Sequence, residues 1–154
     1  MDLGELVTVN GIIPSLKAKT KKQALHELAG FAAELTGLQQ REIFDTLLQR
    51  ERLGSTGLGR GIAIPHVKFK ALSEIVCIFA RLAEPIDFES LDDEPVDLVF
   101  LLLAPEHASG DHLKALARIS RLLREPDVSS QLRACKDRAS ILQVLTQPAQ
   151  PHAA

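Results

Sequence analysis

The sequence predicts an α/β domain in which helices cover a central mixed β-sheet. Strand-sized apolar runs occupy the middle of the chain, and segments with helical periodicity precede and follow them. The length of 154 residues and the hydrophobic share of 45% suit one domain with a substantial core. We therefore expect residues 1–154 to form a single domain.

Two helices are expected before the sheet. Thr20 is a helix N-cap candidate with Gln23 three residues later, as in a capping box, and Gly37 follows as a C-cap candidate. The apolar positions of this first helix lie on one face: Leu25, Leu28, Ala32 and Leu35. A second helix is predicted from about residue 39 to 52, with Gly54 after it.

The strands are predicted from short apolar or β-branched runs. Residues 11–16 are a short candidate, and residues 62–64 form another that ends before His66. Residues 75–82 are rich in β-branched side chains. Residues 96–103 are almost wholly apolar, which predicts a central strand buried on both faces.

The chain becomes helical again after the last predicted strand. Start signals at 109–111 predict a helix that extends to about Leu123. Pro126 suits the first turn of a further helix, and Asp137 is an N-cap candidate for the last one. The Pro- and Ala-rich tail, 148–154, is expected to be frayed.

The composition excludes several classes of function. The formal net charge is −2 and aromatic residues make up 4%, which gives no basic surface or stacking platform for nucleic acid. The start of the chain lacks the features of a signal peptide, and no apolar run is long enough for a membrane span. The two cysteines form no CxxC pair that would suggest a zinc ribbon. We expect a soluble cytoplasmic protein.

A glycine-rich stretch precedes His66, with glycines at 54, 57, 59 and 61, and is expected to be a loop with unusual backbone geometry. It is not a dinucleotide fingerprint, because Ile62 stands where the third glycine is needed and a strand follows it instead of a helix. It is not a P-loop, because Gly-Lys-Ser/Thr is absent. No nucleotide cofactor is expected.

His66 is the strongest candidate for chemistry. A neutral imidazole at the end of a strand can act as a nucleophile toward a phosphoryl group, and N–H groups freed by Gly59 and Gly61 can cradle phosphate oxygens. Ser55 and Thr56 could donate hydroxyl hydrogen bonds, or could simply complete the turn. The alternative for His66 is a hydrogen-bonded strand-end residue without chemistry.

Further candidates flank this segment in the chain. His112 stands at a predicted helix start, where it could donate a hydrogen bond to a phosphoryl oxygen or remain solvated. Arg50 could stabilise the charge of a phosphoryl group in transfer, with Arg52 and Arg60 as competitors for that role. His107 could join His66 and His112 in a zinc site, but no HExxH is present and the spacing fits no common motif, so no metal is expected.

The run Arg50-Glu-Arg-Leu-Gly-Ser-Thr-Gly-Leu-Gly-Arg-Gly-Ile-Ala-Ile-Pro-His66 resembles the active-site segment of enzyme IIA of the phosphoenolpyruvate phosphotransferase system. The segment resembles the mannitol/fructose type of enzyme IIA, and among its members the nitrogen-regulatory enzymes IIA look most similar. The resemblance continues through Glu84–Phe88, Pro95–Leu98 and the segment after His112, and it covers roughly residues 16 to 145.

The resemblance implies roles for individual residues. His66 matches the histidine that accepts the phosphoryl group, through Nε2 in the family, His112 matches the assisting histidine, and Arg50 matches the active-site arginine. It also implies a mixed sheet flanked by helices, a phosphorylated HPr-like donor, and no cofactor. Where the family commonly has Gly or Ala after Pro-His, this chain has Val67, whose branched side chain could narrow access for a partner.

Three functions remain in competition. The first is a regulatory phosphocarrier whose phosphorylation state controls partner proteins by contact. The second is a sugar-specific enzyme IIA that passes phosphate to an enzyme IIB; the absence of a fused IIB or membrane domain favours the first. The third, ranked last, is a metal-binding or receiver-like interaction module.

Overall fold

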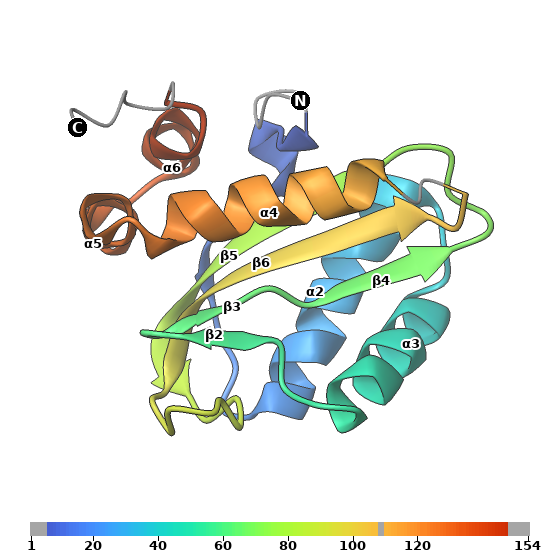
Figure 1. Cartoon of the computed structure of the whole chain (residues 1–154), viewed down its shortest axis with the longest axis horizontal. Coiled ribbons are helices and arrows are strands. Elements are labelled where there is room, and N and C mark those ends of the chain that lie inside the picture. The colour runs from blue at the N-terminus through green and yellow to red at the C-terminus, as the bar shows by residue number, and fades with distance from the viewer. Residues whose placement is uncertain (1–5, 108–109, 148–154) are drawn as a thin grey trace.

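The computed structural model describes residues 6–107 and 110–147, and these form one mixed sheet with helices on both faces (Figure 1). The sheet order is β1-β5-β6-β3-β2, with β4 also paired to β6. Strand bounds are β1 Ile12–Leu16, β2 Gly57–Gly59, β3 Ile62–Ala63, β4 His66–Phe69, β5 Val76–Ile86 and β6 Val96–Pro105. Helical bounds are η1 Val9–Gly11, α2 Lys21–Thr36, α3 Gln40–Arg52, α4 Asp111–Arg124, α5 Pro126–Ala134 and α6 Arg138–Leu145.

The helix ends follow their capping signals. The Thr20 hydroxyl accepts a hydrogen bond from Gln23 N (3.1 Å), while the Gln23 side chain accepts one from Lys19 N (2.8 Å). Gly37 adopts a left-handed conformation (φ 78°) after α2, which a glycine allows without strain. Asp137 accepts from Ser140 N (2.8 Å) at the start of α6. These predicted caps are confirmed.

The central strand is β6, as its apolar sequence predicts. It pairs antiparallel with β5 on one side, and parallel with β3 and then β4 on the other. Every residue of β6 except Asp97 is buried. Because both faces of β6 are covered, alternate side chains enter two separate cores.

The two cores lie on opposite faces of the sheet. One joins α2 and α3 to side chains such as Val99, Leu101 and Leu103, and is called here the α2–α3 core. The other joins α4, α5 and α6 to side chains such as Phe100 and Leu102, and is called the α4–α6 core. Figure 1 shows α4 running across one face of the sheet and α2 behind the other.

The strand predictions need several corrections. Strand β5 continues to Ile86 and β6 to Pro105, beyond the expected ends. The glycine-rich stretch was expected to be a loop, but Gly57–Gly59 forms β2, which pairs antiparallel with β3. His66 does not end the apolar strand: the ladder breaks at residues 64 and 65, and His66 begins β4. The expected fraying of 148–154 lies outside the described residues.

Burial determines the protonation state of one cysteine, Cys77. Cys77 lies in β5 as part of the α4–α6 core, and burial raises the pKa of its thiol to about 12. A thiol with this pKa stays protonated near neutral pH and is no nucleophile. In the part of the chain that the structure describes, no helix is long and apolar enough to cross a membrane.

Candidate functional site

His66 stands where the strand beside β6 resumes after its break. Leu102 N donates to Pro65 O across the break (2.9 Å), and His66 is then in register with Leu102. Leu102 belongs to the α4–α6 core, while Val67 packs against the α2–α3 core. His66 therefore points to the sheet face that α4 covers, and it remains half-buried.

The imidazole of His66 is oriented by the chain just before it. Its Nδ1 lies 2.8 Å from Ile64 O, which can only accept a hydrogen bond. Nδ1 therefore carries the proton, and in the neutral ring Nε2 keeps its lone pair. Ile64 is buried, so this carbonyl is held in place. In this arrangement Nε2 is the ring nitrogen whose lone pair could act as a nucleophile.

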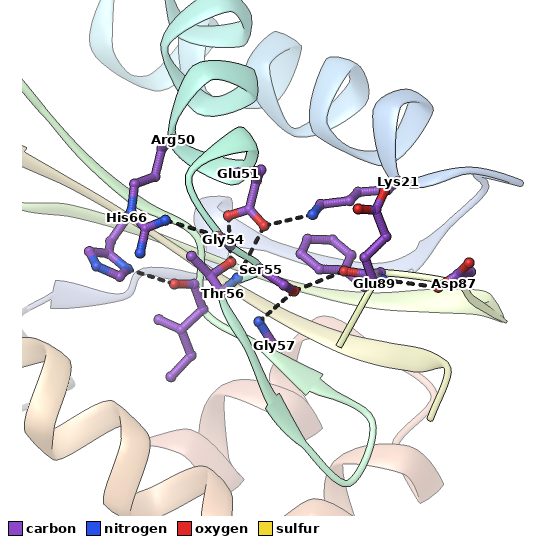
Figure 2. Close-up of polar contacts among 12 residues, drawn as sticks. Lys21, Arg50, Glu51, Gly54, Ser55, Thr56, Gly57, His66, Asp87 and Glu89 are labelled. Carbon is purple, nitrogen blue, oxygen red and sulfur yellow. Dashed lines mark hydrogen bonds and ion pairs between the residues drawn. The ribbon is translucent and has the colours of Figure 1, made fainter. Parts of the chain in front are cut away.

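Arg50 reaches the site from the last turn of α3. Its Nη1 donates to Gly54 O (3.0 Å), and Figure 2 shows the side chain extending from the helix toward His66. Arg50 is half-buried, whereas Arg52 is exposed. The bond to Gly54 limits the motion of the guanidinium, so among the candidate arginines Arg50 is the one held in the loop that leads to His66.

The hydroxyls of Ser55 and Thr56 are both engaged within the protein (Figure 2). Ser55 Oγ donates to Phe88 O (2.8 Å) and accepts from Gly57 N (3.1 Å). Thr56 Oγ1 donates to Glu51 Oε2 (2.6 Å). Both side chains hold the loop that connects α3 to β2.

Gly59 and Gly61 lie at the far end of the segment, Gly59 as the last residue of β2 and Gly61 in the turn that leads to β3. A Cβ at Gly59 would meet Asp92, and one at Gly61 would meet Arg133 and Asp97. The register partners of Ile62 and His66 on β6 are Leu98 and Leu102, about 13 Å apart. The structure does not bring these two glycines to His66, nor Arg60, which lies in the same turn and donates its N–H to Asp92.

His112 lies in the first turn of α4 and is half-buried. The buried residues of this helix share the α4–α6 core with Ile64 and Leu102, the residues that flank His66. α4 thus covers the sheet face to which His66 points. His107 lies exposed in the turn after β6. Among the described residues, no three His, Cys, Asp or Glu side chains are placed to hold a metal ion.

A family model described as "Phosphoenolpyruvate-dependent sugar phosphotransferase system, EIIA 2" matches residues 5–147. The chain belongs to this family. It is 58% identical to a nitrogen regulatory protein of Bradyrhizobium diazoefficiens over 148 residues, which cover 96% of this chain and 97% of that protein.

Solved structures agree with this membership. The nitrogen regulatory protein IIA-Ntr of Neisseria meningitidis has a TM-score of 0.89 and 31% identity, over 94% of this chain and 99% of that one. The mannitol IIA of Escherichia coli has a TM-score of 0.75 at 23% identity, over 90% and 98% of the two chains, which shows a shared fold. The mannitol-type enzyme IIA fold expected from the sequence is confirmed.

Sequence reasoning missed one feature beside the candidate site, a buried pair of charges that contacts the loop between α3 and β2. Glu51 Oε1 lies 3.0 Å from Lys21 Nζ, and the two side chains are only 2% and 12% exposed. A signal was available in the sequence. Lys21 begins α2 and Glu51 lies in the last turn of α3, and each charge is at the helix end where the helix dipole disfavours it. Each charge therefore gains from the other as its partner.

Val67 also lies differently from the expectation. Its side chain is half-buried against the α2–α3 core, on the opposite sheet face from His66. The branched side chain therefore fills space between the sheet and the helices behind it.

Proposed function

We propose that this single IIA-like domain is a cytoplasmic phosphocarrier that accepts a phosphoryl group on His66 from a phosphorylated HPr-like protein. Its phosphorylation state would then regulate other proteins by contact. The observation that carries the proposal is the hydrogen bond from His66 Nδ1 to Ile64 O, which leaves Nε2 as the nucleophile. Family membership and the similarity to nitrogen regulatory proteins support the regulatory role.

The proposed step is an in-line transfer between two imidazoles. The N–P bond of the donor phosphohistidine breaks, and its electron pair returns to the donor ring. The lone pair of His66 Nε2 forms the new N–P bond. His66 keeps its Nδ1 proton, and the positive charge that develops on its ring strengthens the bond to Ile64 O.

The charge on the moving phosphoryl group needs local stabilisation, because the chain has a formal charge of −2 and no general excess of cations. Arg50 supplies a fixed guanidinium from α3. His112 would assist from the first turn of α4, where N–H groups unused by the helix favour an anion. In this proposal the hydroxyls of Ser55 and Thr56 hold the loop, and loop N–H groups contact the phosphoryl oxygens.

The alternative is a sugar-specific enzyme IIA that passes its phosphoryl group to an enzyme IIB. The family description, which names a sugar phosphotransferase system, supports this alternative. Both functions use the same acceptor, so the difference lies in what takes the phosphoryl group from His66.

The test is incubation with enzyme I, an HPr-like carrier and radiolabelled phosphoenolpyruvate. The wild type should take up acid-labile, base-stable label, and His66→Ala should take up none. His112→Ala and Arg50→Gln should still be labelled, but more slowly, by roughly 10- to 100-fold. Label that persists in His66→Ala would refute the acceptor assignment. Transfer of label to an added enzyme IIB and then to sugar would favour the alternative.

A further inference from the structure

A continuous set of hydrogen bonds joins the buried ion pair to the nucleophile. The Glu51 carboxylate contacts Lys21 Nζ at 3.0 Å and accepts from Thr56 N (3.1 Å) and Thr56 Oγ1 (2.6 Å). Thr56 O then accepts from Ile64 N (3.0 Å), and Ile64 O contacts His66 Nδ1. The side chain of Glu51 thereby fixes, through two residues, the carbonyl that orients the imidazole.

The same carboxylate also secures the other side of the site. Glu51 directly follows Arg50 in α3, so any shift of Glu51 moves the backbone that carries the guanidinium. Glu51 O accepts from Gly54 N (3.1 Å), and Gly54 O accepts from Arg50 Nη1 (3.0 Å). Figure 2 shows these residues around the loop between α3 and β2.

Because Glu51 is buried, each of its hydrogen bonds is needed to keep this arrangement in place. Both oxygens of Glu51 have protein partners, and its side chain is 2% exposed, so water cannot replace a lost partner. Lys21 is held as well, because its Nζ lies 4.8 Å from the centroid of the Phe88 ring. Phe88 is itself buried, and its carbonyl accepts from Ser55.

We propose that Glu51 is a positioning residue for phosphoryl transfer. With Lys21 and Thr56 it holds His66 in the Nδ1-protonated form and keeps Arg50 beside it. The inference rests on the proposed function for its effect on transfer. Its effect on the imidazole needs no phosphoryl donor and is measured separately.

Two substitutions remove parts of the arrangement while keeping side-chain volume. Glu51→Gln removes the charge, and Thr56→Val removes the hydroxyl donor but keeps both backbone bonds. Matched controls lie elsewhere on α3, at exposed Asp45 and half-buried Thr46. Asp45→Asn removes a carboxylate from the exposed contact with Arg41, and Thr46→Val removes a hydroxyl that donates to Glu42 O within the same helix.

The first measurement is the imidazole nitrogen chemical shifts of His66 by NMR, in folded protein without donor. The wild type and both controls should show the Nδ1-protonated form, and Glu51→Gln and Thr56→Val should show a raised share of the other tautomer. The second measurement is the labelling rate at increasing donor concentration. We expect the two test variants to lose roughly 10- to 100-fold in kcat with KM unchanged, since the donor-facing surface is untouched.

The outcomes separate the two proposals. If the wild type accepts phosphate and the test variants match the controls in both measurements, the positioning role is refuted. If the wild type accepts no phosphate at His66 but the test variants change its tautomer, the proposed function fails and the positioning stands. If Glu51→Gln does not fold, the same two measurements are made on Thr56→Val and on the double variant Lys21→Met/Glu51→Gln, which removes both charges. Their agreement with the controls would refute the positioning role in the same way.

Discussion

Two carboxylates make ion pairs near opposite ends of β6, and their surroundings differ. Glu51 lies near the end where β4 begins at His66; its side chain is 2% exposed, and that of its cationic partner Lys21 is 12% exposed. Asp97 lies in β6 at the opposite end, beside the turn of the β2–β3 hairpin, which is called here the hairpin end. Its side chain is 22% exposed and pairs with Arg133, which is 37% exposed.

Each carboxylate makes several polar contacts, but water can replace a lost contact only where the side chains are exposed. Arg133 donates from Nε to Asp97 Oδ2 (2.8 Å) and from Nη2 to Asp97 Oδ1 (3.0 Å), and Nη2 also donates to Arg60 O (2.8 Å). Water can substitute for any of these bonds at a half-exposed site. It cannot do so at Glu51. The comparison teaches that the end of the sheet bearing His66 is held by a buried network in which water cannot replace a missing partner, whereas at the hairpin end it can.

The largest expected effect is the difference in free energy of unfolding between Glu51→Ala and Asp97→Ala. Glu51→Ala leaves Lys21 as an unpaired buried charge, and should lower the free energy of unfolding by about 3–5 kcal/mol. Asp97→Ala should cost about 1 kcal/mol. Urea denaturation of both variants measures this. Equal losses would show that burial does not separate the two networks.

A smaller effect is expected from Gly61→Ala at the hairpin end. Gly61 has φ 82°, and an added Cβ would lie 2.6 Å from Arg133 Nη2 and 2.9 Å from Asp97 Oδ1. Gly37→Ala is the control, since Gly37 has φ 78° with nothing within 4 Å of the added Cβ. Both should lose about 1–2 kcal/mol through the left-handed backbone.

Gly61→Ala should lose about 1 kcal/mol more than Gly37→Ala, because it also displaces the exposed ion pair. Thermal unfolding of the two variants gives the difference. An equal loss would mean that Arg133 moves aside at no cost, and that the hairpin end is even more tolerant than the comparison states.

The smallest expected effect concerns pH at the hairpin end. Hydrogen bonds from the backbone N–H groups of Arg60 and Glu94 lower the pKa of Asp92 from its ordinary value of 3.8. Because the folded pKa is the lower one, this contribution to stability is complete above pH 3.8 and is lost as pH falls through the folded value.

Asp92→Asn should therefore be slightly less stable than the wild type near neutral pH, and the gap should close in acid. Urea denaturation at a series of pH values checks the direction. The effect is small because Asp92 is fully exposed. A gap that widens on acidification would contradict the assignment.

Local signals account for most of the predicted fold. The helices have clear starts and stops, such as Thr20 with Gln23 and Gly37 at α2, and these depend on residues within one or two turns. β6 is nearly all apolar, which a central strand requires. β2 and β4 were missed because three residues of Gly-Leu-Gly and four of His-Val-Lys-Phe have no strand pattern of their own. They are strands only because β3 and β6 pair with them.

The candidate site divides in the same way. His66 and Arg50 could be named from a contiguous motif, and both side chains are held by carbonyl groups of that same motif, Ile64 O and Gly54 O. Glu51 was overlooked because Arg-Glu-Arg at a helix end suggests an exposed surface, and its partner Lys21 belongs to another helix. Burial of a charge is a tertiary property, so only the misplacement of both charges relative to their helix dipoles hinted at it.

The pairing of His66 with Leu102 bears on the order in which this molecule is built. His66 is held by contacts that run from Lys21 in α2 to Leu102 in β6. It belongs to β4, which pairs parallel with β6, so no local hairpin can form this pairing. During synthesis the chain leaves the ribosome from its N-terminus, and such distant pairings form only when both partners have emerged. A nascent chain that ends before β6 therefore has its motif but not its oriented imidazole. In the function proposed above, competence for phosphoryl transfer would arise only once the sheet has formed around its central strand.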